Sequence, residues 1–123
     1  MARQRVASMS SPMPTLDLPA KYLSILQRIL ADLAPQAKVW TYGTRVTGKA
    51  HEGSDLDLVV RYPIGAERSS LGALGAALSD SDIPILVDVH DWDRIPQEFC
   101  SEIEKAHVVI QRPHTAVAVT SVV

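Results

Sequence analysis

Two acidic residues, Asp55 and Asp57, stand at the start of the apolar run Ser-Asp-Leu-Asp-Leu-Val-Val. Side chains two positions apart on a β-strand point to the same face, so both carboxylates project together while the leucines turn toward the core. Two such carboxylates repel each other unless a cation lies between them, and oxygen ligands favour Mg²⁺ or Mn²⁺ over zinc. The alternative is an ordinary solvent-facing strand edge, although aspartate is depleted in strands.

A glycine-containing turn precedes this pair in the chain. Residues 38–42 are rich in strand formers and end abruptly in Gly43-Thr44, where a helix is expected to begin. Such a turn lets backbone N–H groups approach a phosphate, the helix N-terminus adds a favourable dipole, and the Thr44 hydroxyl can donate a hydrogen bond. Most strand–helix turns bind nothing, but next to the paired carboxylates this one would complete a metal–triphosphate site.

The elements that would hold these residues alternate along the chain. Apolar residues recur at helical spacing in residues 19–33, and residues 55–61 form the clearest strand. Further helices are expected at residues 44–50, 69–78 and 96–106, and further strands at residues 38–42, 83–90 and 108–111. This order predicts an α/β (α+β) domain with helices packed on a small sheet. We expect it at residues 15–112, between a mobile N-terminal tail (1–14) and a C-terminal tail (113–123).

Composition narrows the class of protein. The 123 residues carry a formal net charge of -2, which argues against bulk nucleic-acid binding because phosphate contacts need a surplus of Lys and Arg. The single cysteine, Cys100, excludes an internal disulfide and a multi-cysteine zinc site. No apolar run approaches the ~20 residues of a membrane span, and the N-terminus does not read as a secretory signal. We therefore expect a cytoplasmic protein without a membrane partner.

The spacing of the chemical residues resembles a known signature. Gly43-Thr44, ten intervening residues and then Asp55-Leu56-Asp57 resemble the Gly-Ser, ten residues, Asp-x-Asp pattern of the DNA polymerase beta-like nucleotidyltransferase superfamily. The stretch GTRVTGKAHEGSDLDLVV is similar to the minimal nucleotidyltransferase (MNT) family, with Thr44 replacing the usual serine. The resemblance covers roughly residues 20–111. It implies a small mixed sheet flanked by helices and a metal-dependent transfer of a nucleoside monophosphate.

The family has a third carboxylate on a neighbouring strand downstream, where this chain offers Asp88, Asp91 and Asp93. Asp88 is preferred because it lies within the apolar strand, where an unpaired carboxylate is costly and a metal offsets that cost. Asp91 is the alternative. His90 shares strand parity with Asp88 and could line the site, but a lone histidine beside acids is more often a hydrogen-bonded structural residue.

The resemblance assigns roles to these residues. Asp55 and Asp57 would hold a metal that bridges the triphosphate, and Asp57 with Asp88 would hold a second near the acceptor hydroxyl. The catalytic and metal-binding set is therefore Asp55, Asp57 and Asp88. The expected nucleotide-binding set is Gly43, Thr44, Arg45, Lys49 and Ser54. Arg45 and Lys49, one helical turn apart, would neutralise phosphate oxygens or else form a solvated helix face.

The acceptor must come from elsewhere, because a chain of this length has no room for an acceptor-binding domain. Resemblance to the MNT family implies an antitoxin that transfers AMP from ATP, with Mg²⁺ (or Mn²⁺), to a tyrosine of a HEPN-type toxin. Two alternatives remain open: a small-molecule (aminoglycoside-like) nucleotidyltransferase whose acceptor pocket forms in an oligomer, and a non-catalytic antitoxin that masks its toxin.

Overall fold

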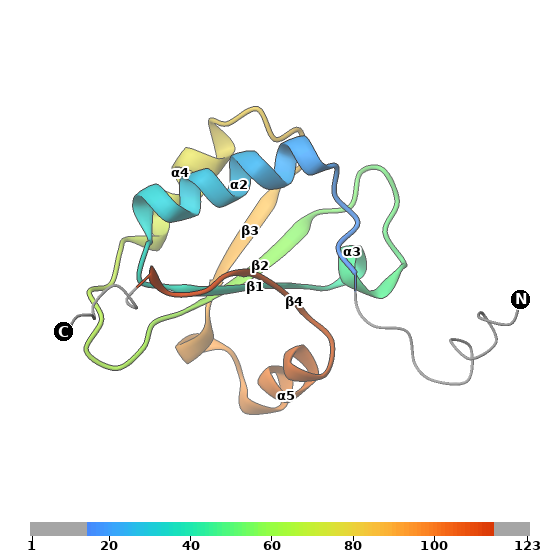
Figure 1. The fold of residues 1–123 in the computed structure, drawn as a ribbon. Coiled ribbons are helices and arrows are strands. Elements are labelled where there is room, and N and C mark those ends of the chain that lie inside the picture. Colours follow the sequence, from blue (N-terminus) through green and yellow to red (C-terminus); the bar gives the residue numbers. More distant parts are fainter. Residues whose placement is uncertain (1–14, 115–123) are drawn as a thin grey trace, which may run out of the picture.

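The computed structural model describes residues 15–114, which form a four-stranded sheet with helices on both faces (Figure 1). The elements in chain order are α2 (Ala20–Leu33), β1 (Lys38–Tyr42), α3 (Thr44–Thr47), β2 (Leu56–Arg61), α4 (Leu71–Ser79), β3 (Val87–Asp91), the 3₁₀ turn η1 (Trp92–Arg94), α5 (Gln97–Lys105) and β4 (Val108–Gln111). The expected tail of residues 1–14 and residues 115–123 of the C-terminal tail lie outside the described part. None of the described helices is long and apolar enough to cross a membrane.

The sheet has the strand order β3-β2-β1-β4 and is mixed. β1 runs antiparallel to both β2 and β4, whereas β2 and β3 are parallel. Parallel neighbours need a crossover connection, and α4 supplies it between β2 and β3. The predicted fold class, a small mixed sheet flanked by helices, is confirmed.

One face of the sheet is buried under α2 and α4. Leu26 and Leu30 of α2 and Leu74 and Leu78 of α4 pack on this face. The sheet contributes alternate residues of its strands, as strand periodicity requires: Val39, Leu56, Leu58, Val60 and Ile110. This core holds β2 rigidly, so the residues between its buried side chains must point to the opposite face.

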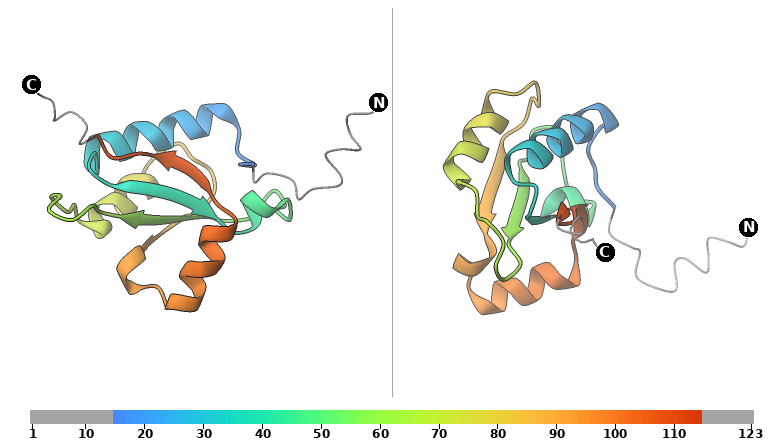
Figure 2. Two further views of the ribbon diagram at one scale, coloured as in Figure 1. Left: turned by 60° about the horizontal axis from the view of Figure 1, so that its bottom comes forward. Right: turned by 60° about the vertical axis from the view of Figure 1, so that its left-hand side comes forward.

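The opposite face is only partly covered, by α5. Figure 2 shows α5 on the side of the sheet away from α2 and α4. A second, smaller core lies here, in which Ile103 of α5 packs with Tyr42 and Val59, and Trp40 and Trp92 border it. Polar side chains of β2 and β3 occupy the remaining part of this face.

Three element boundaries differ from the predicted ones by two residues or more. α3 ends at Thr47 because Gly48 adopts a left-handed conformation with φ of 81° and caps the helix. α4 begins at Leu71 because Ser70 is its N-cap, its hydroxyl accepting a hydrogen bond from the Ala73 N–H. β3 begins at Val87, four residues later than predicted, and Pro84, which lacks the N–H that a ladder needs, lies before the strand.

Candidate active site

Three residues form one row across neighbouring strands. Asp57 of β2 pairs with Tyr42 of antiparallel β1 and with Asp88 of parallel β3. Directly paired residues project to the same face of a sheet, and here it is the face that carries α5. Gly43 follows Tyr42 at the end of this row, so the turn between β1 and α3 lies beside the carboxylates.

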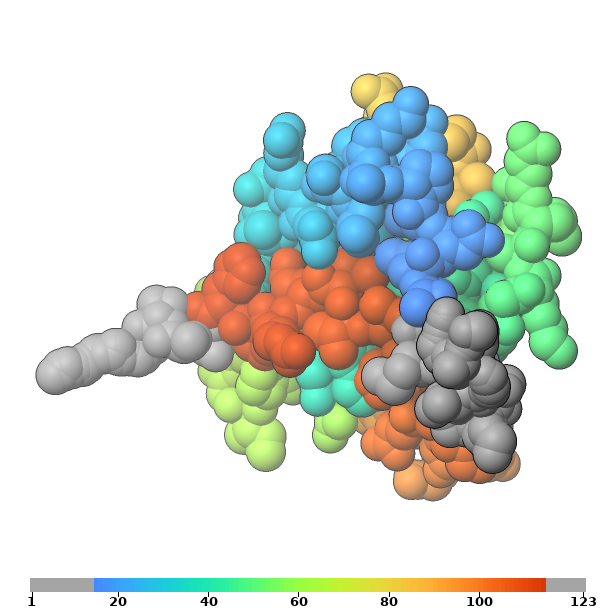
Figure 3. All heavy atoms as spheres, turned by 45° about the vertical axis from the view of Figure 1, so that its right-hand side comes forward, coloured from blue at the N-terminus to red at the C-terminus, as the bar shows by residue number. Residues whose placement is uncertain are grey.

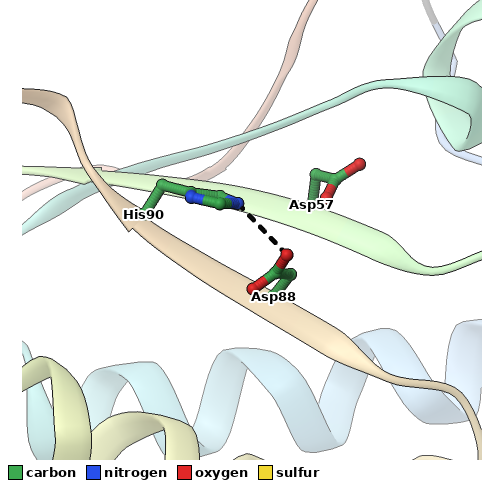
Figure 4. A group of neighbouring side chains, drawn as sticks. All are labelled: Asp57, Asp88 and His90. Atoms are coloured by element: carbon green, nitrogen blue, oxygen red, sulfur yellow. Dashed lines mark ion pairs between the residues drawn. The ribbon is translucent and has the colours of Figure 1, made fainter. Parts of the chain in front are cut away.

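Asp57, Asp88 and His90 form a compact cluster on this face. Each offers one ligand atom, and these atoms all lie within 4.8 Å of one another. His90 Nε2 is 3.3 Å from Asp88 Oδ2, and the two side chains are 39% and 51% exposed. Figure 4 shows this pair on β3 with Asp57 beside it on β2. The cluster is therefore reachable from solvent and has the composition of a metal site.

The turn at Gly43 is pressed against Asp57. A Cβ added at Gly43 would lie 2.7 Å from Asp57 Oδ2, closer than real Cβ contacts allow. The backbone there has φ of 93° and ψ of -157°, a region that only glycine adopts readily. Behind it, the buried Thr41 hydroxyl donates to the Asp57 carbonyl oxygen at 2.9 Å. Glycine at this position therefore permits the turn and the carboxylate to share one small space.

The electrostatics of the row favour a bound cation. Burial raises the pKa of Asp57, and the neighbouring Asp88 carboxylate raises it further. Burial, with the charges of Asp57 and Asp88, raises the pKa of Tyr42 to about 12, so its phenol stays neutral. Both shifts come first from burial and then from neighbouring negative charge, and a divalent cation bound here would offset that charge. The two carboxylates and the imidazole therefore form a donor set that could hold a divalent cation.

Asp88 and Asp91 lie on opposite faces of β3. Asp91 pairs in register with Val60, whose side chain belongs to the α2–α4 core, and its carboxylate forms an ion pair with Arg68 at 3.2 Å. Asp88 is the acid that lies beside Asp57. The reason given for it from the sequence was wrong, however, because Asp88 is half exposed and not embedded among apolar side chains; strand alternation turns it away from them.

Asp55 stands apart from the cluster. It precedes the first residue of β2, and its side chain is exposed. The charge of Asp55 raises the pKa of Asp57 less than burial or the Asp88 carboxylate does. In the described residues, the group of potential metal ligands contains His90 where the sequence predicted Asp55.

Arg45 has a different role from the expected one. It is only 6% exposed, and its guanidinium donates to four backbone carbonyls: Asp17 (2.8 Å), Ser54 (3.0 Å), Glu52 (3.2 Å) and His51 (3.4 Å). The Asp17 N–H returns a bond to the Arg45 carbonyl at 2.8 Å. Figure 3 shows the segment before α2, in blue, against the loop after α3, in green. The prediction that Arg45 neutralises phosphate is wrong, because the N–H groups of its guanidinium already donate to backbone oxygens.

The remaining nucleotide-binding candidates fall into two groups. Ser54 is buried, and its hydroxyl accepts a hydrogen bond from the His51 N–H at 2.9 Å, so it shapes the loop before β2. Thr44 and Lys49 are exposed around the Gly43 turn. Lys49 lies beyond the cap at Gly48, so the expected helical spacing between Arg45 and Lys49 is wrong. A helix of four residues also contributes much less dipole than the predicted one.

We expect Arg45→Met to destabilise the fold by on the order of 3 kcal/mol, because four loop carbonyls lose a buried charged donor. Urea denaturation of the full chain measures the change. Lys49→Met removes the same charge from an exposed position nearby and should change stability by less than about 0.5 kcal/mol. Equal stabilities for the two variants would contradict the structural role of Arg45.

Two residues that lie in or beside the cluster are absent from the site predicted from sequence. The parity of His90 with Asp88 was a usable signal, because it places both side chains on one face. Tyr42 was assigned only to its strand, and its position opposite Asp57 depends on the antiparallel register of β1 and β2. No local pattern encodes that register.

Comparisons with known proteins agree with this fold. Residues 23–121 match the nucleotidyltransferase domain family. The chain is 38% identical over 102 residues to a probable protein adenylyltransferase MntA of Haemophilus influenzae, covering 83% of this chain and 90% of the relative. Among solved structures, it resembles a toxin–antitoxin with AMP-PNP (TM-score 0.60, 18% identity, 76% of each chain). It also resembles the toxin–antitoxin MntA-HepT (TM-score 0.56, 17% identity, 80% of this chain and 76% of that one).

These matches show that the chain, with its acidic cluster beside the Gly43 turn, is a nucleotide-transferring enzyme. The chain belongs to the nucleotidyltransferase domain family. The family and the enzyme class predicted from the Gly43-Thr44 and Asp55-x-Asp57 spacing are thereby confirmed.

Proposed function

We propose that this nucleotidyltransferase transfers AMP from ATP to a hydroxyl group of a partner protein, as the antitoxin of a pair whose toxin is of the HEPN type. Mg²⁺ is the proposed metal, with Mn²⁺ as the alternative. The observation that carries the chemistry is the Asp57–Asp88 pair, which lies beside the Gly43 turn and is reachable from solvent. The proposed site of the reaction is the cytoplasm, where ATP is available.

The choice of reaction rests on the relatives. The Haemophilus influenzae relative is a probable protein adenylyltransferase, and the match spans nearly all of its length. The two solved structures compared above are of toxin–antitoxins, one of them with the ATP analogue AMP-PNP. Because this chain resembles these proteins in sequence and fold, we assign it the same substrates, ATP and a partner protein.

The shape of the site supports an acceptor carried by another molecule. Asp88 is half exposed, and α5 covers only the part of this sheet face around Tyr42 and Val59. Small molecules are bound tightly in pockets that bury most of their surface. A protein acceptor can instead supply its own contact area, of the order of 800 Å² per partner, and place one hydroxyl at the carboxylates.

The proposed reaction is an in-line displacement at the α-phosphorus. A bond forms between the acceptor oxygen and this phosphorus, the bond from the α-phosphorus to the bridging oxygen breaks, and pyrophosphate leaves. Asp88 is positioned at the exposed end of the row to accept the hydroxyl proton. Asp55 and Asp57 would hold a metal on the triphosphate side of the site, and this metal would supply charge stabilisation of the attacking and leaving oxygens.

The Gly43 turn is the proposed contact for the triphosphate. Gly43 and Thr44 present backbone N–H groups at the first turn of α3, where the first N–H groups of a helix have no intrahelical partner. The exposed Thr44 hydroxyl and Lys49 ammonium can reach phosphate oxygens from the same loop. Arg45 and Ser54 act indirectly, by fixing the loop that leads into Asp55.

The test is transfer to the product of the adjacent reading frame. With labelled ATP and Mg²⁺, we expect label on a tyrosine of that protein, an added mass of one or more adenylates on the peptide, and no label after chelation with EDTA. The Asp57→Asn variant serves as the inactive control. Preferential labelling of an aminoglycoside would favour the small-molecule alternative, and tight binding of the neighbour without any transfer would favour masking.

A further inference from the structure

We propose that His90 is a direct metal ligand, so that Asp57, Asp88 and His90 together form a mixed oxygen–nitrogen site that selects Mn²⁺ over Mg²⁺ more strongly than carboxylates alone would. This inference rests on the metal-dependent transfer proposed above. It adds a specificity-determining residue that the signature of paired aspartates does not contain.

The geometry of the cluster fits coordination of one ion. Cis ligands of an octahedral ion at ~2.1 Å from the metal lie ~3.0 Å apart. His90 Nε2 and Asp88 Oδ2 are 3.3 Å apart. One ligand atom each of Asp57, Asp88 and His90 also lie within 4.8 Å of one another, close to the spacing that ligands of one ion need.

The backbone holds these three residues in place. Asp88 and His90 are two positions apart on β3, so both project to the face of Asp57. Val89 between them packs against the core under α2 and α4, which fixes the strand. His90 Nε2 points toward Asp88, as the dashed line in Figure 4 shows. The ring therefore already presents a nitrogen to the carboxylates.

The donor set determines the metal. Mg²⁺ prefers oxygen ligands and retains its water, whereas imidazole is a good ligand for transition metals. Two carboxylates keep the site suitable for an oxygen-preferring ion, and Mn²⁺ accepts both donor types. A nitrogen ligand should therefore raise affinity for Mn²⁺ much more than affinity for Mg²⁺.

Pulsed electron paramagnetic resonance tests the ligand directly. The full-length chain with Mn²⁺ alone, without nucleotide, should show coupling to an imidazole ¹⁴N nucleus. The coupling should vanish in His90→Gln and in His90→Asn, and persist in His114→Gln, whose imidazole lies on the exposed segment after β4. A wild-type spectrum without nitrogen coupling, or coupling that survives in both His90 variants, would overturn the proposal.

Titration calorimetry supplies a second measurement. Since loss of an outer-shell partner already costs about 10–100-fold in metal affinity, His90→Gln should weaken Mn²⁺ binding by at least about tenfold. Mg²⁺ binding should change by less than about threefold. Equal losses for both ions would mean that His90 only orients Asp88.

These binding experiments are independent of the proposed acceptor. Failure of the wild-type protein to label its neighbour with either metal would refute the proposed function and leave the nitrogen coupling intact. Efficient labelling together with an all-oxygen Mn²⁺ spectrum would refute the role of His90 alone.

Discussion

Replacing Asp57 with Asn is expected to lower the rate of nucleotidyl transfer by at least about 10³-fold, since metal-borne charge stabilisation is worth several kcal/mol. Asp57 lies at the centre of the row, next to both Asp88 and the Gly43 turn. Asparagine keeps the shape but removes the charge, and the hydrogen bond from Thr41 survives because it reaches the backbone carbonyl. The measurement is a single-turnover transfer rate at saturating Mg²⁺.

The same substitution should stabilise the metal-free fold. The pKa of Asp57 is raised in the folded protein by burial and by Asp88. The folded state therefore binds more protons than the unfolded state between the ordinary value and the raised one, and wild-type stability falls as pH rises through that window. Asp57→Asn removes this loss, so its melting temperature at neutral pH should exceed that of the metal-free wild type.

The control is Asp32→Asn, on the exposed surface of α2 and outside the described cluster. It should leave the transfer rate and the effect of metal on melting unchanged. Wild-type protein should gain stability on adding Mg²⁺ or Mn²⁺, whereas Asp57→Asn should gain little. Full activity in Asp57→Asn would exclude Asp57 from the metal site.

The sequence predicted the fold because its chemical residues lie on strongly patterned elements. β2 alternates buried Leu56 and Leu58 with Asp57, and this period of two is sufficient to place the carboxylate on the face opposite the leucines. β3 follows the same rule for Asp88, whose strand begins later than predicted but keeps its parity. Periodicity therefore indicates direction only within a strand: Asp55, expected on the same face as Asp57, precedes β2 and stands apart from the cluster.

The failures arise where periodicity carries no information. α3 is a single turn, so the sequence could not show which way Arg45 points, and the carbonyls that bind it come from a loop and from the segment before α2. The proximity of Tyr42 and His90 to Asp57 depends on strand register, which is set by distant packing and by the α4 crossover. Local residue patterns determine neither the direction of the Arg45 side chain nor the register of the strands.

The close approach of Gly43 to Asp57 is the feature with the clearest consequence, because a methyl group would destroy it. In Gly43→Ala, the new Cβ would lie 2.7 Å from Asp57 Oδ2, in a backbone conformation with φ of 93° and ψ of -157°. Relief requires either the turn or the carboxylate to move, and a misplacement of about 1 Å can cost on the order of 10²-fold in rate. We expect that loss in transfer rate, with a stability cost of about 1–3 kcal/mol.

Gly48→Ala separates this clash from positive-φ strain in general. Gly48 also has a positive φ, 81°, but it lies in the left-handed helical region and has nothing within 4 Å of an added Cβ. This variant should lose roughly 1–2 kcal/mol of stability and keep its transfer rate under conditions where it is folded.

Mn²⁺ titration of both variants then shows which substitution disturbs the metal site. Mn²⁺ binding should weaken in Gly43→Ala alone, because only that methyl group displaces Asp57. Equal metal affinities and equal transfer rates in the two variants would show that the turn does not position the Asp57 carboxylate.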